Sequence, residues 1–287
     1  CTTAYGQPPN STPPEPYQWH PTADADGVLI LFPGFGQPAE NILEEFPVLE
    51  AAQQEGYSVL LFNFNRRLWL SAEETEYLAR LTSQLLEKEN QPTQNVVIGG
   101  YSSGGNVALL FCQFLVANQQ TVQPQGVFVV DSPVDLQQLY DHATLAVERN
   151  VAQPAVSEGQ YLKQLFHNTL GTPSKDLARY EQASPYTYST ANITNIGALQ
   201  TISVRLYTEP DLQWWKEERG VQSLSETNSG TLLQLQQTLS KNHGWQNISY
   251  ESTSGKGYRA DGTRHPHSWS IVDVEDLLEW MKSISTH

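Results

Sequence analysis

The chain contains few cysteines, few basic residues and no long apolar run, and each shortage excludes a class of protein. Its 287 residues include only 2 cysteines, too few for a disulfide framework. No segment approaches the run of about 18 apolar residues that a membrane-spanning helix needs. With 16 basic against 31 acidic residues the net charge is −15, which argues against nucleic acid or an anionic membrane surface as a partner. Because the acidic residues are scattered, we interpret them as a solvated surface.

The N-terminal segment has the composition of a tether. Cys1 stands first, and the next sixteen residues are polar with five prolines, as in flexible linkers. Together these features are typical of a mature bacterial lipoprotein, in which the first cysteine carries a lipid and the leader holds the domain away from the membrane. We therefore expect an exported protein, periplasmic or on the cell surface, with a lipid anchor at Cys1. The alternative is an arbitrary start of the sequence and a soluble protein.

Beyond the predicted tether, residues 1–20, apolar runs of strand character alternate with helical patterns. The predicted strands cover residues 28–32, 57–62, 96–101, 127–130, 203–207 and 247–252. The predicted helices cover residues 38–54, 71–85, 103–112, 232–239 and 274–281. Repeated βα units predict a mostly parallel, doubly wound sheet with helices on both faces. The continuous apolar runs are those of strands buried on both faces. We expect one α/β domain over residues 21–287.

One long interruption separates the strand at 127–130 from the strand at 203–207. Within it, residues 160–170 and 173–180 have helical patterns but no strand pattern. A structureless loop of this length is rare in a compact domain. We therefore expect a helical cap, inserted at about 135–198, over the carboxyl edge of the sheet.

The most informative motif is Gly100-Tyr101-Ser102-Ser103-Gly104, which joins an apolar strand run to a helical run of small residues. A Gly-x-Ser-x-Gly in this context is typical of a nucleophile elbow. The serine is held in a strained backbone conformation, and glycines flank it because a β-carbon there would collide with the neighbouring chain. The helix that starts at Ser103 aims unpaired N–H groups at the same point. Ser102 is the candidate nucleophile; the alternative is an ordinary glycine-rich loop.

Taken together, the motifs resemble those of the α/β-hydrolase superfamily over residues 28–281. The matching features are PGFG at 33–36, the Ser102 elbow, an acidic residue after a late strand and a histidine before the last helix. The EPD at 209–211, followed by paired tryptophans, and the HPHSW at 265–269 are also similar to those of uncharacterised bacterial hydrolases. The resemblance implies a mostly parallel sheet, a cap and a serine esterase or lipase-like activity.

The sequence also departs from the family pattern. The family's two opening antiparallel strands have little room before residue 28, so we expect the sheet to be trimmed at that edge. The motif at 33–36 has proline where many relatives have histidine. It also lacks the glycine run of the esterases that act on bulky esters.

A serine hydroxyl needs a base to take its proton, so a histidine must lie within hydrogen-bond reach. The candidates are His265 and His267. The resemblance favours His267, because in the family the base precedes a small residue and an aromatic one at the start of the final helix. His265 is then a surface or supporting residue.

The acid that orients the imidazole has three candidates, since the fold uses the chain order Ser, acid, His. Asp211 follows a late strand, where the resemblance places the acid. Asp131 directly ends the strand at 127–130, a position that some relatives use, and otherwise caps a turn. Glu209 is separated from Asp211 by a proline that turns the chain. Our order of preference is Asp211, then Asp131, then Glu209.

The oxyanion of an acyl-transfer reaction requires N–H donors, which we expect from the backbone of Phe35 and Ser103. The sequence contains no phosphate-binding glycine loop, zinc-ligand spacing or dinucleotide fingerprint, so no cofactor and no metal is implied. We predict a serine hydrolase that cleaves small carboxylic esters through an acyl-enzyme on Ser102, with Asp211 and His267 completing the triad. The alternatives are a peptidase or acyltransferase with the same triad, or a catalytically silent binding protein on this scaffold.

Overall fold

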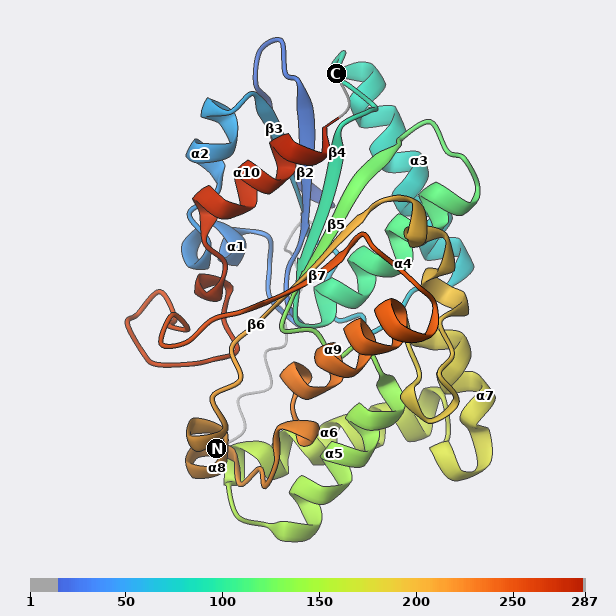
Figure 1. The fold of residues 1–287 in the computed structure, drawn as a ribbon, viewed down its shortest axis with the longest axis vertical. Helices are drawn as coiled ribbons and strands as arrows, with labels where there is room; N and C mark the ends of the chain where they lie inside the picture. Colours follow the sequence, from blue (N-terminus) through green and yellow to red (C-terminus); the bar gives the residue numbers. More distant parts are fainter. Residues whose placement is uncertain (1–14, 286–287) are drawn as a thin grey trace, which may run out of the picture.

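The computed structural model describes residues 15–285, and its centre is a seven-stranded sheet between two layers of helices (Figure 1). The strands are β1 (Tyr17–His20), β2 (Gly27–Phe32), β3 (Tyr57–Phe62), β4 (Val96–Tyr101), β5 (Pro124–Val130), β6 (Ser203–Thr208) and β7 (Ile248–Ser252). Their order is β1-β3-β2-β4-β5-β6-β7, and all neighbours are parallel except β1, which pairs with β3 in the antiparallel direction. The prediction of a mostly parallel, doubly wound α/β sheet is confirmed.

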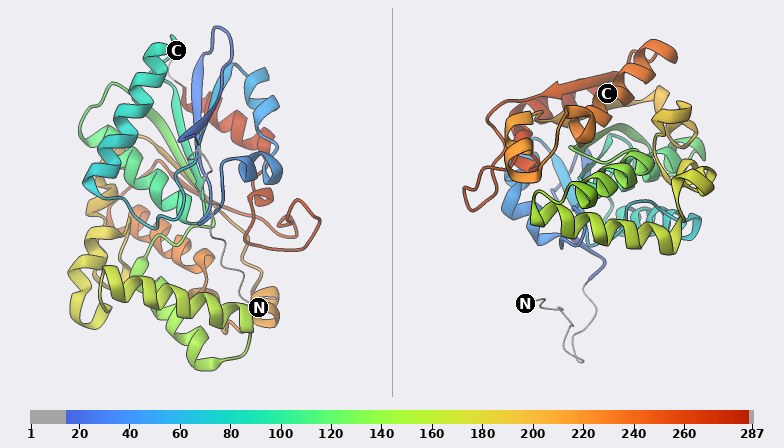
Figure 2. Two further views of the ribbon diagram at one scale, coloured as in Figure 1. Left: turned by 180° about the vertical axis from the view of Figure 1, so that it is seen from behind. Right: turned by 90° about the horizontal axis from the view of Figure 1, so that it is seen from below.

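Helices cover both faces of this sheet (Figures 1 and 2). They are α1 (Glu40–Glu45), α2 (Leu49–Gln54), α3 (Ala72–Lys88), α4 (Ser103–Ala117), α5 (Leu136–Arg149), α6 (Gln153–Thr169), α7 (Pro173–Ala183), α8 (Leu212–Arg219), α9 (Asn228–Gln237) and α10 (Val274–Ile284). Short 3-10 turns are η1 (Tyr188–Thr190), η2 (Thr194–Thr201), η3 (Leu224–Glu226) and η5 (Trp269–Ile271), and η4 (Thr238–Asn242) is a π-helical turn. One core packs α3, α4 and α9 against the sheet; the other packs α1, α2 and α10.

The central strands form because their residues are apolar on both faces. Every residue of β2, β3 and β4 is buried, as in a parallel sheet that is covered on both sides. The start of α3 has a capping box, in which the Ser71 hydroxyl accepts from Glu74 N and the Glu74 carboxylate accepts from Ser71 N. These strands and helices fix the position of the sheet's carboxyl edge.

The prediction of a single helix over residues 38–54 is wrong, because the chain forms two helices there, α1 and α2. Pro47 lacks an N–H and disfavours helical backbone in the residue before it. Phe46 is accordingly extended, with φ −136° and ψ 97°, and α1 ends there. The Phe46 side chain is fully buried, so the break places an aromatic ring in the core.

The folded domain begins before the predicted boundary at residue 21. Tyr17–His20 form β1, and Tyr17 and Trp19 pack against the core. Among the described residues, this one antiparallel strand precedes β2, in line with the expected trimming of that edge. Cys1, with its predicted lipid anchor, lies outside the described residues, as does most of the predicted tether.

Helices α5, α6 and α7 lie together at the carboxyl end of the sheet and form the cap (Figures 1 and 2). They have an apolar cluster of their own, which includes Leu136, Phe166 and Tyr180. The last part of the predicted insertion, η2, instead packs beside α4, with Leu199 in the main core. The helical cap is therefore shorter than the predicted 135–198, because the chain rejoins the sheet layer before residue 194.

Candidate active site

Ser102 lies at the corner between β4 and α4, with φ 55° and ψ −127°. A non-glycine residue in this region is strained, at a cost of about 1–3 kcal/mol. A β-carbon on Gly100 would lie 2.1 Å from the carbonyl oxygen of Gly104, and one on Gly104 would lie 2.3 Å from that of Pro33. The Ser102 N–H donates to Val130 O at 2.9 Å and ties the corner to β5. The strand–turn–helix geometry is that of a nucleophile elbow.

The two predicted oxyanion donors flank this corner. Gln37 holds the loop after β2, since its side-chain oxygen accepts from Gly34 N and its own N–H donates to Gly34 O, both at 3.1 Å. Among the described residues, no acceptor takes the N–H of Phe35. Ser103 is the first residue of α4, where an N–H has no partner inside the helix. Both residues line the same pocket as Ser102.

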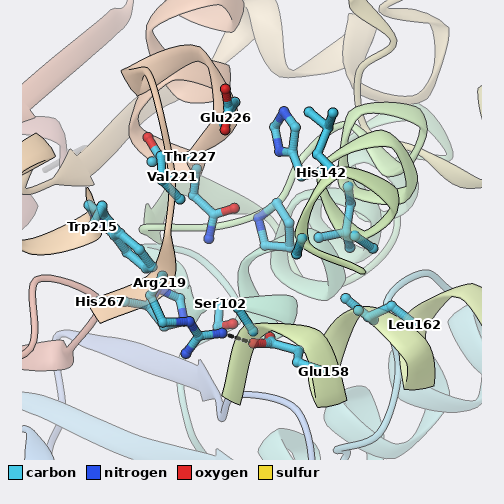
Figure 3. Close-up of a pocket in the computed structure, with 18 of the residues that line it drawn as sticks. Ser102, His142, Glu158, Leu162, Trp215, Arg219, Val221, Glu226, Thr227 and His267 are labelled. Carbon is cyan, nitrogen blue, oxygen red and sulfur yellow. Dashed lines mark hydrogen bonds and ion pairs between the residues drawn. The ribbon is translucent and has the colours of Figure 1, made fainter. Parts of the chain in front are cut away.

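His267 is bonded to Asp131. The His267 Nδ1 lies 2.7 Å from Asp131 Oδ2, and the two side chains are 18% and 3% exposed. Tyr101 holds the other side of the histidine, since its hydroxyl donates to His267 O at 2.8 Å and the two rings lie 4.6 Å apart. His267 and Ser102 line one pocket (Figure 3). The structure contains no direct hydrogen bond from Ser102 Oγ to the imidazole; such bonds are often long without substrate.

Asp131 is itself held by the strands beside it. It ends β5 with φ 45°, and its N–H donates to Tyr207 O at 2.9 Å. Its Oδ1 accepts from Thr208 Oγ1 at 3.3 Å and from Ser229 Oγ at 3.4 Å, which leaves Oδ2 for His267. The carboxylate is thus pre-oriented toward the imidazole by two neighbouring hydroxyls.

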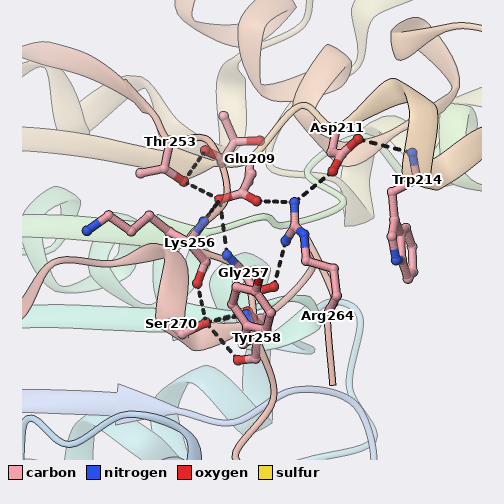
Figure 4. Close-up of polar contacts among 11 residues, drawn as sticks. Glu209, Asp211, Trp214, Thr253, Lys256, Gly257, Tyr258, Arg264 and Ser270 are labelled. Atoms are coloured by element: carbon pink, nitrogen blue, oxygen red, sulfur yellow. Dashed lines mark hydrogen bonds and ion pairs between the residues drawn. The ribbon is translucent and has the colours of Figure 1, made fainter. Parts of the chain in front are cut away.

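The prediction that Asp211 contacts the histidine is wrong. Its Oδ1 accepts from Trp214 N at 3.0 Å and caps α8, and its Oδ2 accepts from Arg264 Nη2 at 2.7 Å (Figure 4). Because α8 begins directly after Asp211, the carboxylate is used by the helix N-terminus. Asp131, the second choice in sequence, occupies the place next to His267.

Glu209 does not contact His267 either. Its side chain is 1% exposed and ion-paired with Arg264. Its Oε2 accepts from Thr253 Oγ1 at 2.9 Å, Lys256 N at 2.8 Å and Gly257 N at 3.1 Å (Figure 4). One buried carboxylate therefore anchors the segment that leads from β7 toward His267.

His265, the alternative base, lies among aromatic rings. Its ring centroid is 4.6 Å from that of Trp214, 6.2 Å from that of Trp215 and 6.1 Å from that of His267. Its Nδ1 is buried and has no hydrogen-bond partner among the described residues. Burial, with a smaller contribution from the neighbouring positive charges, lowers the pKa of His265 to about 3. The ring is neutral at physiological pH and forms part of the pocket wall.

We expect His265 to make the fold acid-sensitive. Its pKa is about 3 in the folded protein and about 6.5 in the unfolded chain, so the unfolded chain binds more protons between these values. Its contribution is fully present above pH 6.5 and is lost as the pH falls toward 3. His265→Gln is expected to flatten the decrease in the free energy of unfolding between pH 6.5 and 4, measured by urea titration. His243→Gln, at an exposed position, is the control; an unchanged slope in His265→Gln would contradict the assignment.

A cavity of about 380 Å³ extends from Ser102 under the cap (Figure 3). One wall is apolar and comes mainly from the cap, with Leu139, Ala143 and Leu162. The cap also packs on the loop after β2, since the Tyr161 and Phe35 ring centroids lie 5.9 Å apart. The cap therefore encloses the space in front of the elbow.

The described residues contain no cluster of three or more His, Cys, Asp or Glu side chains placed to hold a metal ion. The described part of the chain also has no helix that is both long and apolar enough to cross a membrane. Cys112 is fully buried in α4, and burial raises the pKa of its thiol well above the usual range. Cys112 is therefore a core residue.

No protein-family model and no curated protein matches this sequence. Several solved structures are similar. An esterase from Pyrococcus furiosus has a TM-score of 0.54 at 15% identity, covering 94% of this chain and 86% of its own. An acetyl ester-xyloside bifunctional hydrolase from Caldicellulosiruptor lactoaceticus has a TM-score of 0.55 at 15% identity, covering 93% and 87%. Fluorophosphonate-binding serine hydrolase F from Staphylococcus aureus has a TM-score of 0.52 at 9% identity, covering 93% and 86%. At these identities the similarity establishes a shared fold.

Proposed function

From the α/β-hydrolase fold of this chain, we propose that it is a serine hydrolase that cleaves carboxylic esters through an acyl-enzyme on Ser102. The observation that carries the proposal is the Asp131–His267 hydrogen bond in the pocket that holds the strained Ser102. In this assignment Ser102 is the nucleophile, His267 the base and Asp131 the acid. Phe35 and Ser103 supply the oxyanion N–H groups.

The reaction follows from these positions. His267 Nε2 takes the proton of Ser102 Oγ while that oxygen attacks the ester carbonyl carbon, and the carbonyl oxygen takes up negative charge. Two backbone N–H groups stabilise this charge, each worth about 3–4 kcal/mol of the barrier. The C–O bond to the alcohol then breaks, and His267 gives its proton to the leaving oxygen. A water, deprotonated by His267, then attacks the acyl carbon. The bond from that carbon to Ser102 Oγ breaks, His267 returns the proton to Oγ, and the carboxylic acid is released.

Asp131 orients the imidazole and stabilises its cation. The bond to Nδ1 directs Nε2 toward the pocket and fixes the tautomer that accepts a proton there. Several structural neighbours are named as esterases or serine hydrolases, which supports ester hydrolysis as the activity. The apolar wall from the cap suits an acyl chain and excludes water from the acyl-enzyme.

The proposal is tested by active-site labelling. A fluorophosphonate is expected to modify the native protein at one serine, which peptide mapping assigns to Ser102. Ser102→Ala is expected to abolish labelling while melting at a similar temperature, and Ser283→Ala, at an exposed serine of α10 away from the pocket, is the control that keeps the reaction. Folded protein that is not labelled, or is labelled at another serine, would overturn the proposed function.

A further inference from the structure

Five side chains with full charges line the pocket: three arginines and two glutamates. Arg149 is ion-paired with Glu226, with Nη2 3.0 Å from Oε1. Arg219 is ion-paired with Glu158 across the pocket mouth (Figure 3). The third, Arg259, forms no ion pair with any carboxylate in residues 15–285. Among the described residues, the pocket of a strongly acidic protein therefore keeps one arginine that is not ion-paired.

Arg259 is fixed beside the proposed base. Its guanidinium lies over the Tyr101 ring, 5.7 Å from the centroid, and the Tyr101 ring lies 4.6 Å from that of His267. It belongs to a short hairpin closed by the Tyr258–Arg264 bridge, and its N–H donates to Thr263 O at 2.9 Å. This hairpin continues from the segment that Glu209 anchors, so the position of Arg259 relative to His267 is built into the fold.

The acidic residues nearest the hairpin are engaged by its backbone. Asp261 Oδ1 accepts from Thr263 N at 2.8 Å, and Glu45 Oε2 accepts from Ala260 N at 3.1 Å. Both carboxylates therefore brace the hairpin through its backbone. The Arg259 side chain bonds the Tyr101 hydroxyl, and its charge adds to the hydrogen bonds from Thr263 that lower the pKa of Asp261. Its remaining guanidinium donors face no carboxylate within ion-pair distance among the described residues and stay available to a ligand in the pocket.

The position of Arg259 indicates which part of an ester it meets. In the proposed reaction His267 gives its proton to the leaving alcohol oxygen, so the alcohol lies against the imidazole. Arg259 lies on the same side of the pocket as His267, because both residues contact Tyr101: the guanidinium lies over the Tyr101 ring, and the Tyr101 hydroxyl donates to His267 O. The apolar cap wall, which suits an acyl chain, comes from other elements. A group that reaches Arg259 therefore belongs to the alcohol.

We propose that Arg259 binds a carboxylate on the alcohol part of the ester, so that the substrates are acyl esters of hydroxy acids. This inference rests on the proposed function. A guanidinium presents paired donors that match the two oxygens of a carboxylate. Because the protein as a whole is negatively charged, such a substrate needs a local cation to offset long-range repulsion.

The test compares two esters that differ only in this charge: the butanoyl esters of 4-hydroxybenzoate and 4-hydroxybenzamide. Wild-type protein is expected to favour the benzoate ester in kcat/KM, measured from the released phenol. Arg259→Gln is expected to lower kcat/KM for the benzoate ester by about 10- to 100-fold, the range of one charge-assisted contact, and to change the benzamide ester by less than about threefold. Arg259→Lys keeps the positive charge but loses the paired guanidinium donors. It is expected to retain part of the preference for the benzoate ester.

The control is Arg80→Gln, which removes an exposed arginine of α3 outside this pocket and should leave both esters unchanged. Equal losses on both esters in Arg259→Gln, or no preference in the wild type, would overturn the inference. Protein that is labelled at Ser102 but cleaves neither ester would also overturn it. Absent labelling at Ser102 instead contradicts the proposed function, so the two failures are distinguishable.

Discussion

His267→Ala is expected to lower kcat for an ester substrate by about 10⁴- to 10⁶-fold, the range found when the base of a serine triad is removed. Without the imidazole, the Ser102 hydroxyl has no acceptor for its proton, and the leaving alcohol has no donor. The measurement is steady-state turnover of 4-nitrophenyl butanoate, with the melting temperature recorded for each variant.

His265→Ala is the matched comparison, since it removes an imidazole two residues away in the same pocket. It is expected to keep at least about a tenth of the activity, because burial already keeps its ring neutral and its neighbours are aromatic rings rather than a carboxylate. If His265→Ala lost more turnover than His267→Ala at equal folding, the role of base would belong to His265.

Asp131→Asn is expected to lower kcat by about 10⁴-fold with little change in fold. Asparagine tolerates the positive φ of this position and has the same shape, so the backbone bond to Tyr207 O is kept. The amide does not carry the charge that stabilises the imidazolium, and its NH₂ favours the wrong tautomer of His267. The loss should fall on kcat more than on KM, measured with the same ester.

Asp211→Asn tests the residue that the sequence alone placed first. Asparagine caps helices as well as aspartate does, so α8 should form, and kcat is expected to change by less than about threefold. The partial loss of the Arg264 contact should lower the melting temperature slightly. A larger loss of kcat in Asp211→Asn than in Asp131→Asn would restore Asp211 as the acid.

The elbow was predictable because its chemistry is local. A strand, a serine between glycines and a helix are consecutive in the chain, and a β-carbon on Gly100 would collide with the main chain of Gly104, only four residues further along. The apolar runs of β2, β3 and β4 were predictable for the same reason, since burial on both faces favours apolar residues at nearly every position, and Ser58 of β3 is the buried polar exception. The end of α1 before Pro47 could also have been predicted from the proline. It was missed because the residues on both sides of Pro47 have a helical pattern.

The carboxylate that contacts His267 was not predictable, because Asp131 and Asp211 both follow strands that end at the same edge of the sheet. Sequence does not show that Asp211 is taken by the first turn of α8 and by Arg264. It also does not show that Thr208 and Ser229, distant in the chain, turn Asp131 toward His267. Both oxygens of Asp211 accept other hydrogen bonds, whereas Oδ2 of Asp131 is available to bond the imidazole of His267.

Patterns of residues adjacent in the chain were enough to predict the parallel sheet, the elbow at Ser102 and the two candidate histidines, His265 and His267. The contacts between these parts depend on the folded chain. Packing of β5 beside β6 brings Asp131 to His267, and the carboxylate of Glu209 holds the segment that leads to Arg259 and His267. These are hydrogen bonds between residues far apart in sequence, and only the folded chain specifies their partners.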